Sequence, residues 1–158
     1  MIVRCARSSA DELPTSLLQP STGLDESTQF AVREGAIYAV FALTVHEGCI
    51  WYYLCDEEYA YYPVWYPSPL FELVSGEISR HWVYNLWTPR EGGDPIMAFP
   101  EWANCRYYYD RLTDGEEPEV SIFQRYKDLI EQDAETELRS RIEPGANGTG
   151  SGPTNELP

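Results

Sequence analysis

The chain has 158 residues, 43% of them hydrophobic, which suits one domain with a single core. Twenty-six acidic residues against eleven basic ones give a formal net charge of -15, and such a field repels nucleic acids and anionic lipids while it attracts basic surfaces. The sequence shows neither an apolar run of about 18 residues that could span a bilayer nor the apolar stretch of a secretory signal. We therefore expect a cytoplasmic protein without direct nucleic-acid or membrane partners.

Composition divides the chain into three parts. Residues 1–35 are rich in Ser, Thr, Pro and Asp and carry few apolar positions, so we expect an extended segment laid over the core. Residues 36–143 are expected to form the single folded domain. Residues 144–158 are mainly Gly, Ser, Asn, Thr and Pro without core-forming side chains, which predicts a disordered tail.

The first strong β signal lies at 37–55. Two β-rich runs, 37–45 and 49–55, flank a three-residue loop whose last residue, Gly48, can adopt the left-handed conformation of such a hairpin. Pairing about that loop places Leu43 opposite Trp51, so that odd-numbered residues share one apolar face. The even-numbered face is hardly more polar. We expect this hairpin to be central in a closed β structure or half covered by a partner.

The next segment is dense in aromatic residues and prolines. Five aromatic side chains fall within eight residues, at Tyr59, Tyr61, Tyr62, Trp65 and Tyr66. Nearby prolines keep this segment out of a helix and out of a central strand. Beyond it, residues 70–74 and 77–84 are predicted to form a second hairpin through the turn Ser75-Gly76, which would place Arg80 opposite Phe71.

The C-terminal part has a helical period. A further aromatic cluster at 102–109 precedes it, and apolar residues then recur at steps of three to four, at Phe123, Tyr126, Ile130, Ala134 and Leu138. This pattern predicts an amphipathic helix over about 118–141. The predicted fold class is α+β, with mostly antiparallel β-hairpins in a small sheet or partly open barrel and a C-terminal amphipathic helix.

Motifs for catalysis are missing from the sequence. His46 and His81 are its only imidazoles, and no phosphate-binding loop or zinc-protease motif is present. The four cysteines have spacings that suit neither zinc nor an intracellular disulfide. The acidic run before the predicted helix is explained by the helix dipole. We therefore expect no catalytic residue, no metal site and no cofactor.

The aromatic segment is the predicted partner-binding surface. Tyrosine and tryptophan are enriched at interface hot spots, and too many of them crowd this segment for all to point inward. The interpretation assigns Tyr61, Trp65 and Tyr66 as anchors and Asp56, Glu57 and Glu58 as charge partners. It places His81 and Trp82 at the edge of the surface.

Short motifs spread over residues 13–135 carry a resemblance. They include Leu13-Pro14, Tyr38-x-Val40, Gly48 before Trp51-Tyr52, Tyr62-Pro63-x-Trp65-Tyr66-Pro67, Ser79-Arg80-x-Trp82 and Phe99-Pro100-Glu101-Trp102. This set resembles a group of small, acidic, uncharacterised bacterial cytosolic proteins. In size, acidity and aromatic content the chain resembles immunity proteins of bacterial toxin systems, which act by occupying a cognate toxin.

Three functional hypotheses follow. The first is a non-enzymatic cytosolic protein-binding module of the immunity type, which neutralises a toxin domain with a basic surface by occlusion. The alternative is a small-molecule-binding domain or small enzyme whose pocket lies between the hairpins and is lined by Trp51, Tyr53, Trp82 and Arg80. A third, mimicry of DNA charge, would require evenly spaced acidic rows that the sequence lacks. The oligomeric state stays open.

Overall fold

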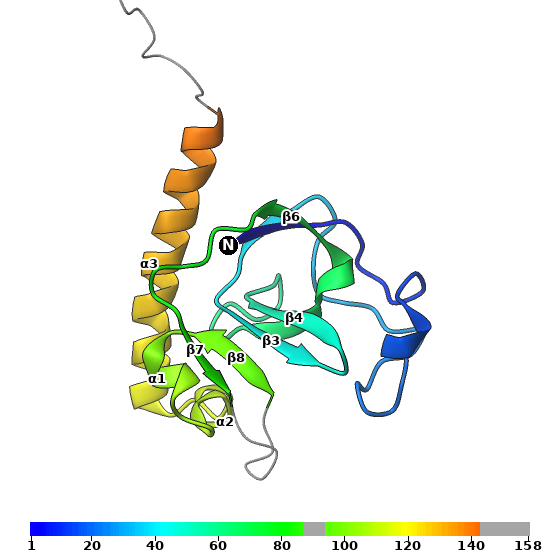
Figure 1. Ribbon diagram of the computed structural model, residues 1–158, viewed down its shortest axis with the longest axis horizontal. Helices are drawn as coiled ribbons and strands as arrows, with labels where there is room; N and C mark the ends of the chain where they lie inside the picture. Colours follow the sequence, from blue (N-terminus) through cyan, green and yellow to red (C-terminus); the bar gives the residue numbers. More distant parts are fainter. Residues whose placement is uncertain (87–93, 143–158) are drawn as a thin grey trace, which may run out of the picture.

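The computed structural model describes residues 1–86 and 94–142. It contains two open antiparallel sheets, a three-stranded one in the order β2-β1-β6 and a five-stranded one in the order β5-β4-β3-β8-β7, with a long C-terminal helix beside them (Figure 1). The predicted α+β class is confirmed. The predicted tail, 144–158, lies outside the described residues.

The elements are short apart from the last helix. The three-stranded sheet comprises β1 (Ile2–Cys5), β2 (Ile37–Ala39) and β6 (Phe71–Ser75). The five-stranded sheet comprises β3 (Ala42–His46), β4 (Cys49–Leu54), β5 (Val64–Pro67), β7 (Val83–Leu86) and β8 (Pro95–Ala98). The helices are α1 (Pro100–Ala103), α2 (Tyr108–Thr113) and α3 (Glu117–Ile142), with 3-10 turns at Thr15–Leu17 and Ser68–Leu70.

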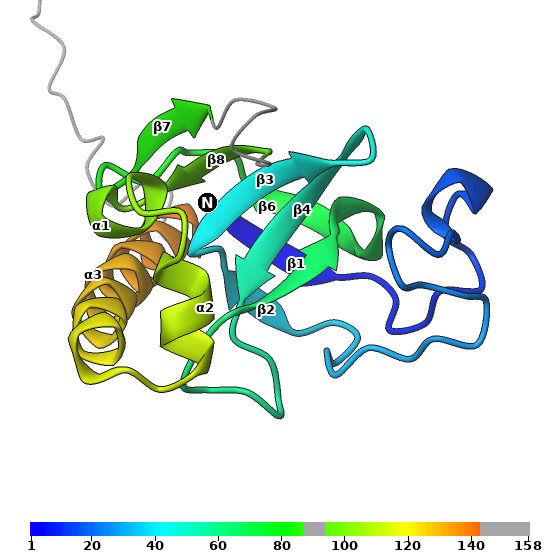
Figure 2. The same cartoon turned by 90° about the horizontal axis from the view of Figure 1, so that it is seen from below.

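Strand β1 lies within the segment that we expected to be extended over the core. It is the central strand of the three-stranded sheet, and its residues Ile2, Val3 and Cys5 are buried. Arg4 points outward, and its guanidinium lies 3.6 Å from the carboxylate of Glu72 on β6. The loops that follow β1 project to the side of the sheets opposite α3 (Figure 2). The start of the chain is therefore an integral part of the core.

The hairpin of β3 and β4 forms, but the predicted register is wrong by one residue. The turn has two residues, Glu47 with φ 49° and Gly48 with φ 73°, rather than three. Two left-handed residues in a row suit a two-residue turn, whose twist matches that of the strands. Thr44, not Leu43, therefore pairs with Trp51. A shift of one residue exchanges the two faces of a strand.

The second predicted hairpin is wrong. Strand β6 pairs with β1, and β7 pairs with β8. Gly76 is not among the residues with positive φ, so the tight turn is not made. Arg80 does not oppose Phe71; its guanidinium lies 2.8 Å from the carboxylate of Asp133 on α3. Long-range pairing with β1 and contacts with α3 thus replace the local hairpin.

Both faces of the β3–β4 hairpin are covered by the protein's own chain, apart from its tip. On one face, Tyr52 and Tyr66 pack edge-on against Phe71 of the small sheet, with ring centroids 6.1 and 6.3 Å away. On the other face, Tyr53 packs edge-on against Trp102 of α1 at 4.9 Å. The expectation of a closed β structure is therefore wrong, because both sheets are open, whereas the alternative of a partner that half covers the hairpin stays a prediction.

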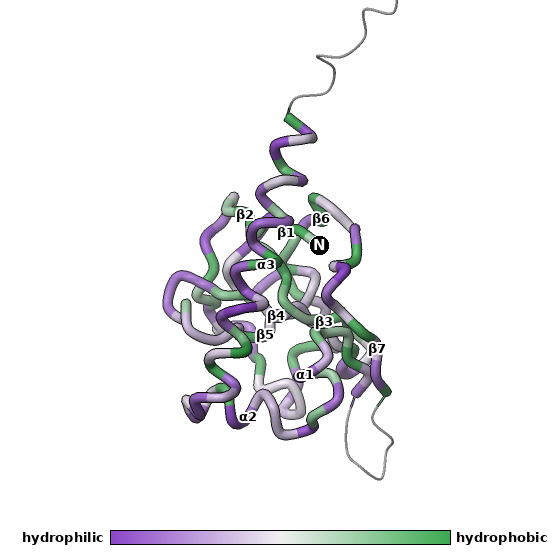
Figure 3. Tube along the Cα trace, turned by 90° about the vertical axis from the view of Figure 1, so that its left-hand side faces the viewer, coloured by the Kyte–Doolittle hydropathy of each residue, from purple (hydrophilic) through white to green (hydrophobic). Residues whose placement is uncertain are grey.

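Helix α3 confirms the predicted amphipathic helix. Phe123 and Ile130 are buried, Phe123 packs edge-on against Phe41 at 5.5 Å, and Tyr126 stacks on Phe99 at 4.2 Å. Hydrophobic stretches of the neighbouring strands lie behind the helix, whose outward turns are mainly hydrophilic (Figure 3). The helix is thus bound to the sheets through one apolar face.

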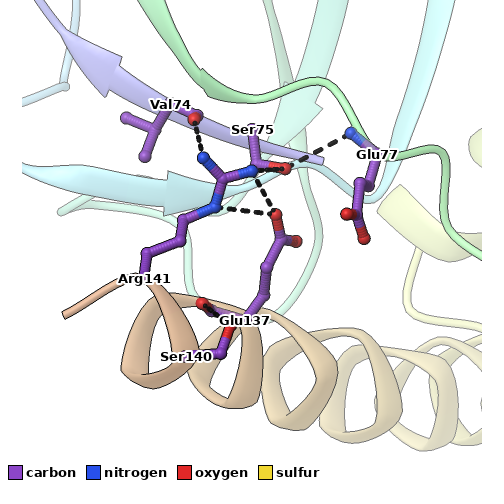
Figure 4. A network of polar contacts seen from close by, with 6 residues as sticks. All are labelled: Val74, Ser75, Glu77, Glu137, Ser140 and Arg141. Atoms are coloured by element: carbon purple, nitrogen blue, oxygen red, sulfur yellow. Dashed lines mark hydrogen bonds and ion pairs between the residues drawn. The ribbon is translucent and has the colours of Figure 1, made fainter. Parts of the chain in front are cut away.

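The last turn of α3 is fastened to β6 by Arg141 (Figure 4). Its guanidinium donates hydrogen bonds to the carbonyl oxygen of Val74 at 3.2 Å and to the hydroxyl of Ser75 at 3.1 Å. Glu137, one turn earlier, accepts from the same guanidinium at 2.9 Å. The end of the helix is thereby joined to the small sheet by polar contacts.

Candidate functional site

Two members of the predicted binding surface face the interior. Tyr66 is 4% exposed and donates a hydrogen bond to the carboxylate of Asp56, which is also buried. Asp56 further accepts hydrogen bonds from the backbone N–H groups of Glu58 at 2.8 Å and Tyr59 at 2.6 Å. Burial, and then the Asp56 carboxylate, raise the pKa of Tyr66. These two side chains hold the loop between β4 and β5 and present no surface to a partner.

The same loop carries the outward members of that surface. The side chain of Tyr61 is 80% exposed, and Glu57 and Glu58 are exposed as well. Glu57 accepts a hydrogen bond from the hydroxyl of Tyr38 at 3.2 Å and lies 3.6 Å from the guanidinium of Arg33. Tyr61 and Glu58 are therefore among the residues of this loop that are exposed to another molecule, together with Tyr59.

His81 is located beside α3, and Trp82 is buried in the core. Trp82 is 8% exposed and belongs to the hydrophobic core. The imidazole of His81 lies 3.2 Å from the carboxylate of Asp133 and packs edge-on near the ring of Tyr126 at 6.2 Å. His81 thus attaches the segment before β7 to the long helix, and Trp82 contributes to the core.

Trp65 lies in a row of rings on one face of the five-stranded sheet. Its ring centroid is 4.6 Å from that of Trp51, 5.3 Å from that of His46 and 6.3 Å from that of Tyr53. The row exists because Tyr53 pairs with Trp65 across β4 and β5, while the two-residue turn brings His46 opposite Cys49. The corrected register is therefore what assembles this face.

Helices α1 and α2 bring two further rings to the same face. Trp102 and Tyr109 are nearly parallel, with centroids 5.6 Å apart and an interplanar angle of 8°. Tyr53 meets both edge-on, at 4.9 and 5.2 Å. The hydroxyl of Tyr109 donates to the carbonyl oxygen of Pro63 at 2.9 Å, which ties α2 to the loop that carries Tyr61.

These rings line a cavity of about 230 Å³, which we name the aromatic cavity. Its walls are Tyr53, Trp65, Trp102 and Tyr109, its acidic groups are Asp94 and Asp110, and its lining is completed by Thr44, Ile96, Cys105 and Arg106. Residues from β3, β4, β5, the start of β8 and the segment of α1 and α2 meet here. The sequence showed the aromatic residues at 59–66 and at 102–109. It did not indicate that the two segments meet in the fold, nor that two carboxylates line the cavity with them.

The electrostatic environment of the aromatic cavity is negative. Burial raises the pKa of Tyr53 far above its ordinary value, and the charges of Asp94 and Asp110 raise it further. Asp94 is held by the imidazole of His46, whose Nδ1 lies 2.7 Å from its carboxylate. Arg106 is exposed, and its guanidinium lies over the ring of Tyr107, 5.7 Å from the centroid. Burial disfavours any charged group, but the negative charges of Asp94 and Asp110, which disfavour a phenolate, favour a cation.

Two larger grooves, each of about 390 Å³, flank α3. One is bordered by residues that include Tyr38, Phe41 and Leu138, and the other by residues that include Arg80 and Asp133. The pocket expected between the hairpins is not assembled in this form, because Tyr53 lines the aromatic cavity while Arg80 lines the second groove and Trp82 is in the core.

The thiols and acidic groups offer little chemistry. All four cysteines are free, and burial raises the pKa of Cys55 to about 12, which keeps its thiol protonated and weakly nucleophilic at neutral pH. Across residues 1–86 and 94–142, no three His, Cys, Asp or Glu side chains are grouped so as to hold a metal ion. What the aromatic cavity offers is flat aromatic surface with two carboxylates.

No family model, curated protein or solved structure matches this chain. None of the helices in the described ranges combines the length and the apolar composition needed to cross a bilayer. The interpretation of function therefore starts from the aromatic cavity and from the charge of the chain.

Proposed function

We propose that this protein is a non-enzymatic cytosolic binding module that neutralises a cognate basic toxin domain by occlusion, as immunity proteins do. The observation that carries the proposal is the aromatic cavity, in which Asp94 and Asp110 accompany four aromatic walls in a chain of net charge -15. Aromatic faces and carboxylates together attract cationic groups. Cationic side chains are what a basic protein presents.

The size of the aromatic cavity supports a side chain as its occupant. Its volume of about 230 Å³ is below the roughly 300–1,000 Å³ of pockets that enclose drug-sized ligands. Nε2 of the neighbouring His46 is buried and has no hydrogen-bond partner among the described residues, so the imidazole activates no described nucleophilic side chain. A nucleophile activated by a base requires such a hydrogen bond. Binding is therefore favoured over catalysis.

The surface beside the aromatic cavity extends the proposed interface. The loop with Tyr61 and Glu58 is joined to the cavity wall through the hydrogen bond from Tyr109 to Pro63. An exposed tyrosine with an adjacent carboxylate is typical of the anchors and charge partners of protein interfaces. In the proposed complex, Tyr61 and Trp65 contact the toxin domain, and the acidic field accelerates its approach.

The test is neutralisation of a defined toxin. The C-terminal domain encoded by a toxin-like reading frame beside this gene is expressed in bacterial cells with and without the protein. We expect growth arrest that the intact protein relieves and a stoichiometric complex of the two purified proteins. Tyr61→Ala should weaken the complex by about 2 kcal/mol without loss of folding. A toxin domain that is acidic, or one that stays toxic when the folded protein is present, would reject the proposal.

A further inference from the structure

We propose that the aromatic cavity binds the guanidinium group of a single arginine side chain. This inference rests on the proposed function, since the arginine would belong to the basic partner, and it names the chemical group that enters the cavity. Two features of the cavity carry it, the orientation of its rings and the position of its carboxylates, and the basic lining residue Arg106 supplies a test of the ligand's charge.

The ring planes suit a flat cation. Trp102 and Tyr109 are within 8° of parallel, and Tyr53 and Trp65 are within 18° of parallel. The two sets are steeply inclined, because Tyr53 meets Trp102 at 74°. A guanidinium group is planar and weakly hydrated, so it stacks on aromatic faces at a small desolvation cost, whereas an ammonium group is compact and strongly hydrated. Tyr53, Trp65 and Tyr109 are half-buried and offer such a surface, whereas Trp102 is only 3% exposed. Flat walls of this kind favour arginine over lysine.

The carboxylates supply acceptors from two directions. Asp94 immediately precedes β8, and Asp110 belongs to the first turn of α2. A guanidinium group has five N–H donors arranged in one plane, so it can donate to two carboxylates while its face rests on a ring. The contact of His46 with Asp94 at 2.7 Å fixes the position of one acceptor before any ligand arrives. A neutral planar group of the same shape would gain the stacking and could donate to the same carboxylates, but it would lack the attraction between opposite charges.

Among the lining residues that the structure describes, Arg106 is the only basic one. Its side chain is exposed and placed over Tyr107, which is not one of the cavity walls. An incoming cation would be repelled by this charge. Removal of Arg106 should therefore strengthen the binding of arginine, whereas an anionic ligand would bind more weakly without it. The effect of one substitution thus reports the sign of the ligand's charge.

The binding test uses blocked amino acids as probes. N-acetyl-arginine amide, N-acetyl-lysine amide and N-acetyl-citrulline amide are titrated into the full chain while the indole N–H signals of the tryptophans are followed by NMR. We expect saturable shifts with the arginine probe in the millimolar range and about tenfold weaker binding of the other two, since a tenfold change in Kd corresponds to about 1.4 kcal/mol. Equal binding of citrulline and arginine would overturn the inference.

Three variants give the test its controls. Asp110→Asn should weaken binding of the arginine probe about fivefold or more, whereas Asp114→Asn, at the C-cap of the same helix and outside the cavity lining, should leave it unchanged. Arg106→Ala should tighten it. If both Asn variants behave alike, or if Arg106→Ala weakens binding, the inference fails. If Asp110→Asn does not fold, the comparison with citrulline and the Arg106→Ala variant still test the inference.

The outcomes also separate this inference from the proposed function. If the protein binds the arginine probe but does not neutralise the toxin domain, the arginine inference stands and the proposed function is rejected. If the Asp110→Asn variant neutralises the toxin domain as well as the intact protein does, and the intact protein does not bind the arginine probe, the proposed function stands and the arginine inference is rejected. The two proposals are therefore independently open to rejection.

Discussion

The phenol of Tyr66 donates a hydrogen bond to one carboxylate oxygen of Asp56, while the other oxygen accepts the backbone N–H groups of Glu58 and Tyr59. This arrangement closes the loop between β4 and β5 from within. Tyr66→Phe would leave a buried carboxylate oxygen without its partner, so we expect a loss of about 1–3 kcal/mol in the free energy of unfolding, measured with urea. Tyr61→Phe, at an 80% exposed site, should change it by less than about 0.5 kcal/mol. Equal effects of the two substitutions would contradict this role.

The stability of the protein should fall at alkaline pH. Burial is the main cause that raises the pKa of four tyrosines far above the ordinary value of 10.0, at Tyr53, Tyr66, Tyr108 and Tyr109. The unfolded chain loses these protons near pH 10 while the folded protein keeps them, so their contribution is fully present below that pH and is lost above it.

The expected slope is about 1.4 kcal/mol per pH unit for each proton retained only by the folded state. Urea unfolding at several pH values between 9 and 11.5 measures it. Tyr53→Phe removes one of the titrating groups and should make the slope shallower by up to that amount. A free energy of unfolding that stays constant over this range would show that the phenols are not held protonated by the fold.

The turn between β3 and β4 should be open to stabilisation. Glu47 has φ 49°, a left-handed conformation that side chains other than those of Asn, Asp and Gly adopt at a cost. Asn-Gly is the preferred pair for a two-residue turn with both residues left-handed. Glu47→Asn should therefore raise the free energy of unfolding by about 0.5–1 kcal/mol, and Gly48→Ala should lower it. Thermal melts of both variants check the signs; a destabilised Asn variant would argue against this turn.

The contacts of Arg141 should protect the end of α3. Arg141→Ala removes hydrogen bonds to Val74 and Ser75 of β6, whereas Arg139→Ala removes only a pair with Glu135 one turn away on the same helix. Hydrogen exchange should accelerate at the backbone amides of the last turn and of β6 in the first variant and stay nearly unchanged in the second. The expected loss of stability is about 1 kcal/mol for Arg141 and less than about 0.5 kcal/mol for Arg139. Similar exchange rates in both variants would show that the contacts of Arg141 with β6 contribute nothing to the stability of the helix end.

The acidic surface should act on the rate of association with the toxin domain. Glu58 is exposed, and exposed charges steer an encounter but are screened beyond about 10 Å at 0.1 M salt. Glu58→Lys should slow association several-fold at low ionic strength, with little change in dissociation, and the difference should shrink as salt is added. Stopped-flow mixing with the purified toxin domain gives both rates. Association that does not depend on salt would remove the steering argument.

Local pattern was sufficient for some elements. The step of three to four between Phe123 and Leu138 predicted α3, because one apolar face against the sheets requires that spacing whatever the sheets look like. The β-rich runs on either side of Gly48 likewise predicted the β3–β4 hairpin, since its partners are adjacent in the chain. The α+β class follows from these two periods, and both are read within single segments.

Long-range pairing decided the rest. Strand β6 found its partner in β1, about seventy residues earlier, in a segment whose composition indicated only an extended path. The turn after His46 shifted the register by one residue and so placed Thr44 and Trp51 on a common face. The aromatic cavity depends on that shift and on the docking of α1 and α2, because Tyr53 and Trp102 meet only in the folded chain. Sequence determined which side chains are aromatic or acidic; tertiary packing, which minimises exposed apolar area over the whole chain, determined which of them share a cavity.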